Sequence, residues 1–466
     1  MKKTAIIYGE LKGGIQKKAI EVMSGLLLEY TKEYPSCFAW DSEIIPSDAL
    51  KIYIGTAGDN PFIKRISASP LTNAEEYCIR VINGDAYIEG ADAAGVLYGC
   101  IDFYNKYLLQ LEHPDNPDRF SKNPLESPLP DFELNSRPAV KNRGIWTWGH
   151  VIYDYRSFID NMVMLKLNTV TIWNDFLPIN AREMADYAHS CGIKLFWGFS
   201  WCWDTNCAEI SLDTLADNAE YLAEKYEREY SASGADGIYF QSCTELKTET
   251  LGGKIIAEAV AELVNKTADL IFKKHPDTEL QFGLHATSVK NRLQFIKNID
   301  SRIRIVWENC GSFPFSYIPK AVQDFEETKR FTEKIAVLRG ENDKFGAVTK
   351  GFTKLDWGTF EHLSGAVSIG GASKAFKADR VARKRRDWKY IQAGWLSNAE
   401  KAHEAVRAMA EIKHGDLYIT PLVEDGMFEE NIMYPVALFS EMLWDTDTPT
   451  SEMMTRVALR NYVDFA

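Results

Sequence analysis

The chain has 466 residues, of which 45% are hydrophobic and 26% charged, the balance of an ordinary globular protein. Its 66 acidic and 53 basic side chains give a formal net charge of −13, which argues against a partner recognised through a phosphate backbone. No apolar run reaches the ~20 residues of a membrane-spanning helix, and the first ten residues make a poor secretory signal. We therefore expect a cytoplasmic protein of two or three domains that binds neither nucleic acid nor membrane, with a homodimer left open.

The eight cysteines are too few and too scattered for a disulfide scaffold. Cys202 and Cys207 are the closest pair, and no second pair stands at metal-site spacing. A thiol nucleophile at Cys243 or Cys310 lacks a nearby histidine. Glycine pairs such as Gly252-Gly253 do not have the spacing of a nucleotide-binding loop. We expect buried, reduced cysteines, no structural metal and no cofactor.

Residues 1–110 contain short β-rich runs at Thr4–Tyr8, Leu50–Gly55, Tyr77–Ile82 and Asp85–Gly90, followed by an apolar helix over Ala93–Leu109. Asn83-Gly84 between the last two runs predicts a hairpin, because both residues tolerate positive φ. This pattern predicts a small N-terminal α/β domain. Residues 111–142 are rich in Pro, Asn, Asp and Ser, which is typical of an extended linker.

Residues 143–466 alternate short apolar strands with long helices. Helices are expected, for example, at Tyr155–Leu165, Leu212–Tyr230, Lys254–Lys274 and Val322–Arg339. The strands are expected at Gly144–Trp148, Thr169–Trp173, Ile193–Phe199, Gly237–Phe240, Leu280–Leu284, Ile303–Trp307, Ala347–Phe352 and Leu417–Val423. Parallel strands need such crossovers, and eight repeats over ~300 residues predict a (β/α)₈ TIM barrel with enlarged loops. A doubly wound sheet is the competing architecture, but the first strand is not followed by a glycine-rich phosphate loop.

Indole and polar side chains gather where the predicted strands end, which is where barrel enzymes place their chemistry. Indole faces stack on the C–H faces of sugar rings, although any single tryptophan is more often a core residue. Together they favour a sugar-binding mouth. The substrate-binding candidates at these strand ends are Trp148, His150, Trp173, Asn174, Asp175, Trp203, His285, Trp307 and Trp357.

Three carboxylates are the catalytic candidates. Glu245 follows the fourth strand after a short polar step, which places it at the rim as a general acid for a departing glycosidic oxygen. Glu308 and Asp356 end the sixth and seventh strands, and either could serve as general base or nucleophile. Rim carboxylates also form salt bridges and helix caps, and that interpretation stays open. The basic run Arg380–Arg386 is interpreted as the solvated face of a helix.

Several short motifs resemble glycoside hydrolase family 20, the β-N-acetylhexosaminidases. They are Asn142-Arg143-Gly144-Ile145, Asp160-Asn-Met162, Lys166-Leu-Asn168, Trp307-Glu308 and Tyr434-Pro435 through Trp444. The segment from Tyr77 to Gly99 resembles the α/β domain shared with the family 67 α-glucuronidases. The resemblance implies a barrel glycosidase in which Glu245 is the acid and Arg143 binds a sugar hydroxyl.

The fourth strand departs from that family. Family 20 ends this strand with an Asp-Glu pair whose Asp orients the 2-acetamido group, whereas this chain has Thr244-Glu245. We therefore expect an exo-acting hydrolase that cleaves terminal sugars from oligosaccharides, with a separate carboxylate partner for Glu245, as resemblance to the α-glucuronidases implies. The alternatives are a hexosaminidase with an altered active site and a carbohydrate-binding barrel without catalysis.

Overall fold

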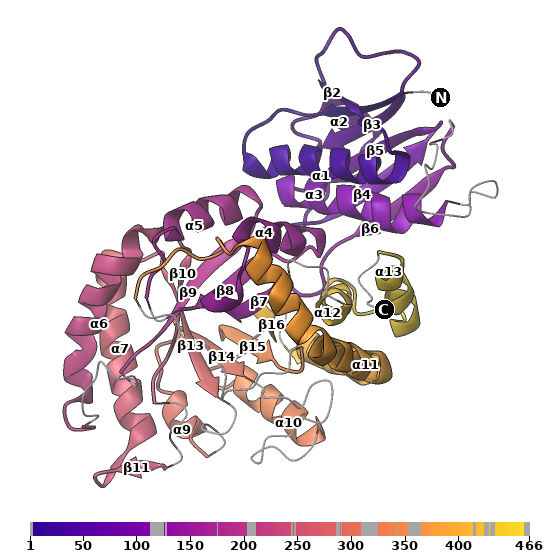
Figure 1. The fold of residues 1–466 in the computed structure, drawn as a ribbon. Helices are drawn as coiled ribbons and strands as arrows, with labels where there is room; N and C mark the ends of the chain where they lie inside the picture. The colour runs from indigo at the N-terminus through magenta and orange to yellow at the C-terminus, as the bar shows by residue number, and fades with distance from the viewer. Residues whose placement is uncertain are drawn as a thin grey trace. The chain divides into compact units, whose positions relative to one another are not determined.

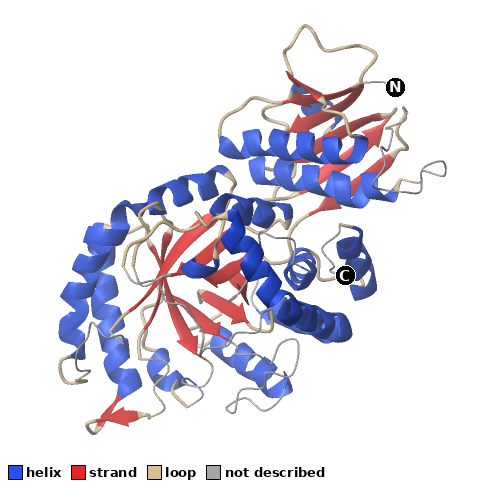
Figure 2. Ribbon diagram, in the orientation of Figure 1, coloured by secondary structure: helices blue, strands red, loops and turns tan. Residues whose placement is uncertain are grey.

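The computed structural model divides the chain into two compact units, residues 1–138 with 189–192, and 139–188 with 193–466. The residues it describes are 3–111, 125, 128–174, 176–202, 211–243, 246, 248–285, 289, 291–308, 325–341, 343–352, 365–412, 416–423, 428 and 434–460. Each unit has its own sheet and its own buried core. Figure 1 traces both units, and Figure 2 shows the helices and strands.

The first unit is a six-stranded sheet in the order β2-β1-β3-β5-β4-β6 with helices packed against it. Its strands are β1 (Thr4–Tyr8), β2 (Ser36–Ala39), β3 (Leu50–Gly55), β4 (Tyr77–Ile82), β5 (Asp85–Gly90) and β6 (Phe132–Ser136). Its helices are α1 (Gly14–Thr31), α2 (Pro61–Ile66) and α3 (Ala93–Asp102), the last continuing into a π-helical turn over Phe103–Tyr107. The expected α/β domain is confirmed.

Local sequence signals explain the middle of this sheet. Asn83 and Gly84 have φ values of 53° and 85°, so the predicted turn joins β4 to β5 as an antiparallel hairpin. Asp92 caps α3 by accepting a hydrogen bond from the amide of Gly95 at 2.8 Å. Strand β6 was not expected, because its residues fall in the proline-rich stretch; it pairs antiparallel with β4 at the sheet edge.

The second unit is a closed barrel of eight parallel strands in the order β10-β13-β14-β15-β16-β7-β8-β9. This confirms the predicted (β/α)₈ barrel. Its strands are β7 (Asn142–Trp148), β8 (Thr169–Trp173), β9 (Lys194–Ser200), β10 (Gly237–Gln241), β13 (Glu279–His285), β14 (Arg304–Glu308), β15 (Phe345–Thr349) and β16 (Leu417–Val423). A short antiparallel pair, β11 (Thr250–Leu251) and β12 (Lys254–Ile255), precedes helix α7.

Helices surround these strands (Figure 2). They are α4 (Tyr155–Met164), α5 (Ala181–Ser190), α6 (Ala219–Lys225), α7 (Ile256–Lys274), α9 (Leu293–Ile296), α10 (Phe325–Ala336), α11 (Lys374–Ile412), α12 (Tyr434–Trp444) and α13 (Thr450–Leu459). Helix α11 is the longest of these helices and has a kink at Asn398. Among the described residues no helix is long and apolar enough to cross a membrane.

Candidate active site

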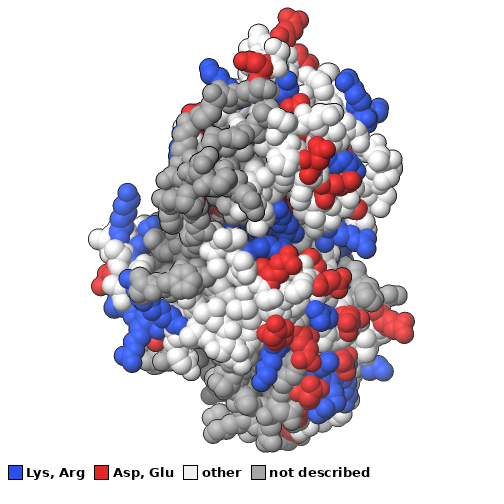
Figure 3. Space-filling view, turned by 90° about the vertical axis from the view of Figure 1, so that its right-hand side faces the viewer, with Lys and Arg blue, Asp and Glu red and all other residues white. Residues whose placement is uncertain are grey.

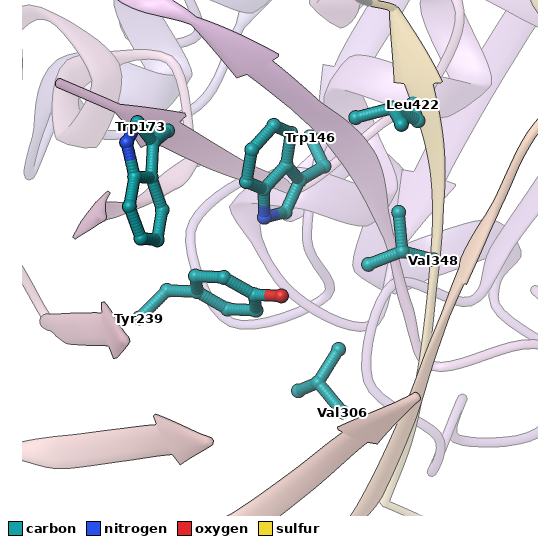
Figure 4. Packing of buried hydrophobic residues seen from close by; sticks show 6 residues of the cluster. All are labelled: Trp146, Trp173, Tyr239, Val306, Val348 and Leu422. Carbon is teal, nitrogen blue, oxygen red and sulfur yellow. The ribbon is translucent and has the colours of Figure 1, made fainter. Parts of the chain in front are cut away.

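Alternate residues of each barrel strand face inward, and they fill the interior with side chains. Six of them form one buried cluster, to which six barrel strands contribute one residue each: Trp146, Trp173, Tyr239, Val306, Val348 and Leu422 (Figure 4). Trp148, the last residue of β7, packs against this cluster and is partly exposed. The cluster is therefore the floor of the carboxyl-end mouth.

Glu308 stands at the centre of the polar groups above this floor. It is the last residue of β14 and only 5% exposed. Its Oε1 accepts hydrogen bonds from the Tyr239 hydroxyl, at 2.8 Å, and from the Gln241 side-chain amide. The ammonium of Lys350, just beyond β15, lies 3.7 Å from Oε2. Three polar groups are thus directed at one carboxylate at the barrel mouth.

A glycine makes room for this arrangement. A Cβ at Gly283 would lie 1.9 Å from the Tyr239 hydroxyl oxygen. Any residue other than glycine at this position of β13 would therefore collide with the phenol. The Gln241 side-chain amide also donates to the Tyr239 hydroxyl, at 3.2 Å. Tyr239 and Gln241 are two residues apart on β10 and therefore point to the same face of the strand. The position of the Glu308 carboxylate is thus determined by two residues of β10 and one glycine of β13.

Indoles form the other side of the mouth. The rings of Trp148 and Trp173 have centroids 5.8 Å apart with a 60° interplanar angle. Trp146 lies beneath both, 5.5 Å from Trp148 and 6.2 Å from Trp173. Gly198 on β9 lets Trp173 lie flat, because a Cβ there would come within 3.0 Å of the indole. Of these indoles Trp148 is the one with partial exposure, so it offers a ring face to a ligand at the mouth.

Three further candidates occupy the same end of the barrel. His285 ends β13 in register with Glu308, and it is partly exposed. His150 follows β7, with its ring 6.3 Å from that of Trp148. Asn174 is buried after β8, and its side-chain amide donates to the carbonyl of Phe176, which fixes the turn that leaves the strand. The structure therefore brings Trp148, His150, Trp173, Asn174, His285 and Glu308 to one end of the barrel.

Two candidates lie elsewhere. Trp307 was expected to line the pocket, but its neighbour Val306 faces inward, so by strand alternation its ring faces out and packs 5.0 Å from Phe331 of α10. Arg143 was expected to bind a hydroxyl. It lies near the start of β7, 1% exposed, and donates to the main-chain carbonyls of Val140, Lys141 and Lys166. Neither side chain joins the groups at the mouth.

The remaining candidates fall outside the described residues. They are Glu245, Asp356, Asp175, Trp203 and Trp357. Within the described part of the chain, no group of three or more His, Cys, Asp or Glu side chains is arranged to hold a metal ion.

The amino-terminal end of the barrel is closed by an ionic layer. Arg304, at the start of β14, is 1% exposed and donates to Glu279 at 2.8 Å and to Asp416 at 2.9 Å. Its guanidinium also lies 3.9 Å from the ring centroid of Tyr418. Burial acts to lower the pKa of Arg304, but the charges of Glu279, Tyr418 and Asp416 raise it above its ordinary value. The charged groups described at this end of the barrel are thus engaged with one another.

Sequence reasoning missed Tyr239, Gln241 and Lys350. A signal existed for the first two: Tyr239 and Gln241 stand two residues apart at the end of an apolar strand and therefore share one face of it. Lys350 fell inside the expected strand Ala347–Phe352, whereas the strand ends at Thr349. A lysine near the end of a strand is ordinarily a solvated side chain, so it carried no such signal.

No family model and no curated protein matches this sequence. Several solved structures are similar to it. The chain is similar to the family 20 chitobiase of Flavobacterium johnsoniae, with a TM-score of 0.58 and 12% identity over 98% of this chain and 68% of that one. It is similar to the β-N-acetylhexosaminidase of Bacteroides fragilis, with a TM-score of 0.54 and 14% identity over 96% and 88%.

A third similar structure is a family GH115 4-O-methyl-α-glucuronidase, with a TM-score of 0.57 and 13% identity. That comparison covers 99% of this chain but 59% of the α-glucuronidase, so the chain spans less than two thirds of that protein. At such identities the likeness shows the fold. The chain therefore has a glycoside-hydrolase-like fold, in agreement with the resemblance noted in its sequence.

Proposed function

We propose that this chain is an exo-acting glycoside hydrolase. The observation that carries the proposal is Glu308, a carboxylate at the barrel mouth held by the Tyr239 hydroxyl, the Gln241 amide and Lys350. The partly exposed indole of Trp148, at the same end of the barrel, suits the C–H face of a sugar ring. Barrel enzymes do their chemistry at this end of the strands, and the fold is that of glycoside hydrolases.

The proposed mechanism uses two carboxyl groups. Glu245 protonates the departing glycosidic oxygen as general acid, while Glu308 acts from the other side of the sugar as base or nucleophile. Asp356 is the alternative second carboxylate. Fixed donors around Glu308 suit the second role rather than the acid role, because the general acid must begin with a proton to give. Whether Glu308 activates water or attacks the sugar depends on the separation of the two carboxyl groups.

The proposed substrates are glycosides other than 2-acetamido sugars. Cleavage assisted by the acetamido group requires a carboxylate that orients its amide, and Thr244 stands where family 20 has that Asp. A lost charged hydrogen bond of this kind removes about 1.5–3 kcal/mol of transition-state stabilisation. A hexosaminidase with an altered site is the alternative, and inhibition by a thiazoline analogue of the reaction intermediate would favour it.

The test is a panel of nitrophenyl glycosides of both anomers, covering hexosides, uronides and hexosaminides. On the best substrate, Glu245→Gln should lose roughly 10²–10⁴-fold in rate, the usual value of general acid help. The same variant should lose little on the dinitrophenyl glycoside of that sugar, because this leaving group departs without a proton. Glu308→Gln should lose activity on both substrates, since its role does not depend on the leaving group.

Two outcomes contradict the proposal. Equal loss by Glu245→Gln on the two leaving groups removes Glu245 from the acid role. Saturable sugar binding by the wild-type chain, with no turnover at high protein concentration across the whole panel, identifies a carbohydrate-binding barrel instead. Thermal melting of both variants controls for folding.

A further inference from the structure

The first half of helix α11 carries a local excess of positive charge. Residues 374–389 contain eight Lys and Arg against two Asp, in a chain whose formal net charge is −13. Two ion pairs neutralise part of it: Arg383 with Asp379 at 2.7 Å, and Lys377 with Asp154 at 3.8 Å. Figure 3, which shows the right-hand side of the view in Figure 1, has Lys and Arg atoms at its left edge.

This segment begins beside the barrel mouth. The amide of Ala372 donates to the carbonyl of Tyr153 at 3.0 Å, and Gly371 forms an isolated β-bridge with Asp154. Arg380 is buried and donates to the Tyr153 hydroxyl at 3.0 Å. Residues 153 and 154 follow the carboxyl end of β7, where Trp148 and His150 lie. The start of α11 is therefore fixed to the rim of the candidate active site.

The exposed face of this helical segment combines cations with aromatic rings. Phe376, Arg383 and Tyr390 recur every seven residues, which places them on one face of the helix. The two rings are 42% and 63% exposed. They are about 21 Å apart along the helix axis at 1.5 Å per residue. Arg383 and Arg386 lie between them, both exposed.

We infer that this face, defined by Phe376, Arg383, Arg386 and Tyr390, is a docking surface for an acidic glycan chain whose sugars carry carboxylates. Guanidinium groups bind carboxylates through paired hydrogen bonds, and aromatic rings stack on sugar faces. A glycan lying along α11 leads to the rim at Tyr153. The inference deepens the proposed function, on which it rests for the identity of the glycan as a substrate.

A nucleic acid is the other polyanion that a basic and aromatic face could bind. Duplex DNA carries one negative charge per ~1.7 Å, and its affinity comes mainly from many phosphate contacts. A molecule with a net charge of −13 repels so dense a polyanion outside this one face. A uronate chain has at most one charge per sugar ring, which matches cations spaced three or four residues apart on a helix.

The experiment is calorimetric titration of the full chain with two probes: oligogalacturonate, and the same oligosaccharide with its carboxylates methyl-esterified. The wild type should bind the acid form more tightly, and added salt should reduce the difference. Arg383→Gln/Arg386→Gln should raise the Kd of the acid form by roughly 3–10-fold and leave the ester form unchanged. Tyr390→Ala should weaken both forms.

The matched control is Lys266→Gln/Lys273→Gln on α7. It removes the same charge, and Lys266 pairs with Glu262 four residues away as Arg383 pairs with Asp379. This control should leave both Kd values unchanged. Melting temperatures of all variants establish that they fold.

Equal affinity for the acid and ester forms, equal effects of the two double variants, or tighter binding of a DNA duplex than of oligogalacturonate would overturn the inference. The proposed function fails separately. A wild type that hydrolyses no glycoside but binds the acid form through Arg383 and Arg386 contradicts the hydrolase and keeps the docking surface. Hydrolysis of a glycoside by a wild type that shows no preference for the acid form keeps the hydrolase and contradicts the docking surface.

Discussion

Tyr239 connects the packing of the barrel to its polar chemistry. Its ring belongs to the interior cluster, with centroids 5.6 Å from Trp146 and 6.1 Å from Trp173. Its hydroxyl meets Glu308 and the Gln241 amide. The ring packs against indoles, and the hydroxyl occupies the space that a side chain at position 283 would fill. The phenol is therefore kept directed at the carboxylate. Tyr239 is therefore a positioning residue for Glu308.

Tyr239→Phe should preserve the fold and impair catalysis. The ring stays, while a hydrogen bond to a charged group worth about 1.5–3 kcal/mol is lost. We expect kcat to fall roughly 10–100-fold with little change in KM, since in the proposed function the sugar binds to the indoles and not to this hydroxyl. Steady-state kinetics on the best nitrophenyl glycoside measure both constants.

The control is Tyr418→Phe at the other end of the barrel. The Tyr418 hydroxyl also donates to a carboxylate, Glu279, at 3.3 Å, but within the ionic layer that closes the amino-terminal end. This variant should keep kcat. A Tyr239→Phe enzyme as active as the wild type would show that the hydroxyl does not position a catalytic group.

At the residue level, the alternation of side chains along a strand explains why two neighbouring candidate residues of β14 lie on different faces. Glu308 and Trp307 are adjacent, and both were assigned to the pocket, yet neighbouring residues of a strand point to opposite faces. The cluster residue Val306 shows that Glu308 faces inward and Trp307 outward. A list of strand ends without their alternation therefore joins a carboxylate that faces the barrel interior with an indole that faces the surrounding helices.

At the level of elements, Arg304 joins three strands at the closed end of the barrel. It reaches Glu279 of β13 and, through Asp416, the start of β16. Burial alone would raise the pKa of Asp416, but the charge and hydrogen bond of Arg304, with Lys141 and Asn142, hold it below its ordinary value. Such a carboxylate stabilises the fold while it is ionised.

Acid should therefore weaken the link between Arg304 and Asp416. Because the pKa of Asp416 is lower in the folded chain than in the unfolded one, its contribution is fully present above pH ~4 and is lost as the pH falls through the folded value. The difference in urea midpoint between the wild type and Asp416→Asn should be largest near pH 7 and shrink by pH 3. A difference that stays constant over this range would contradict the link.

His403 provides a second pH-dependent link, between α11 and the residues around α13. Its ring nitrogens bond Thr450 Oγ1 at 2.9 Å and the Thr446 carbonyl at 3.0 Å. Burial and the charge of Arg407 lower the pKa of His403, despite the opposing effects of the Thr446 carbonyl, Glu400 and Asp445. The ring is therefore neutral in the folded chain at pH 7.

A histidine with a lowered pKa stabilises the fold above its unfolded pKa, ~6.5, and loses that contribution as the pH falls through the folded value. The wild type should lose stability between pH 7 and pH 5. His403→Gln should lose less over the same interval, because glutamine does not titrate. Parallel losses in the two proteins, measured by urea unfolding, would show that protonation of His403 does not affect stability.

The elements themselves were largely predictable. The eight barrel strands are apolar runs closed by turn signals, so their positions followed from composition, as did the hairpin at Asn83-Gly84. Strand β6 was missed because the prolines around it favour an extended linker, and the strand it pairs with, β4, lies far earlier in the sequence. Pairing between segments far apart in the sequence leaves no local signal.

At the scale of the whole molecule, each unit has a core of its own. In the first unit Ile7, Tyr53 and Ile63 form a buried cluster. In the second, the interior cluster includes Leu422 together with the indoles below the mouth. A domain with its own hydrophobic core can unfold as a separate cooperative step.

Two core substitutions test whether the units unfold separately. Ile7→Ala and Leu422→Ala each remove a buried aliphatic side chain, 0% and 3% exposed, and should each cost about 2–5 kcal/mol. In scanning calorimetry we expect two transitions, with Ile7→Ala lowering one midpoint and Leu422→Ala the other. Ile7→Ala should also keep the rate of the proposed glycosidase reaction at 25 °C, because the cluster it weakens is not the one beneath Glu308. If both substitutions instead shift one common transition, the two cores form a single cooperative unit, and activity should then decline with stability in both variants.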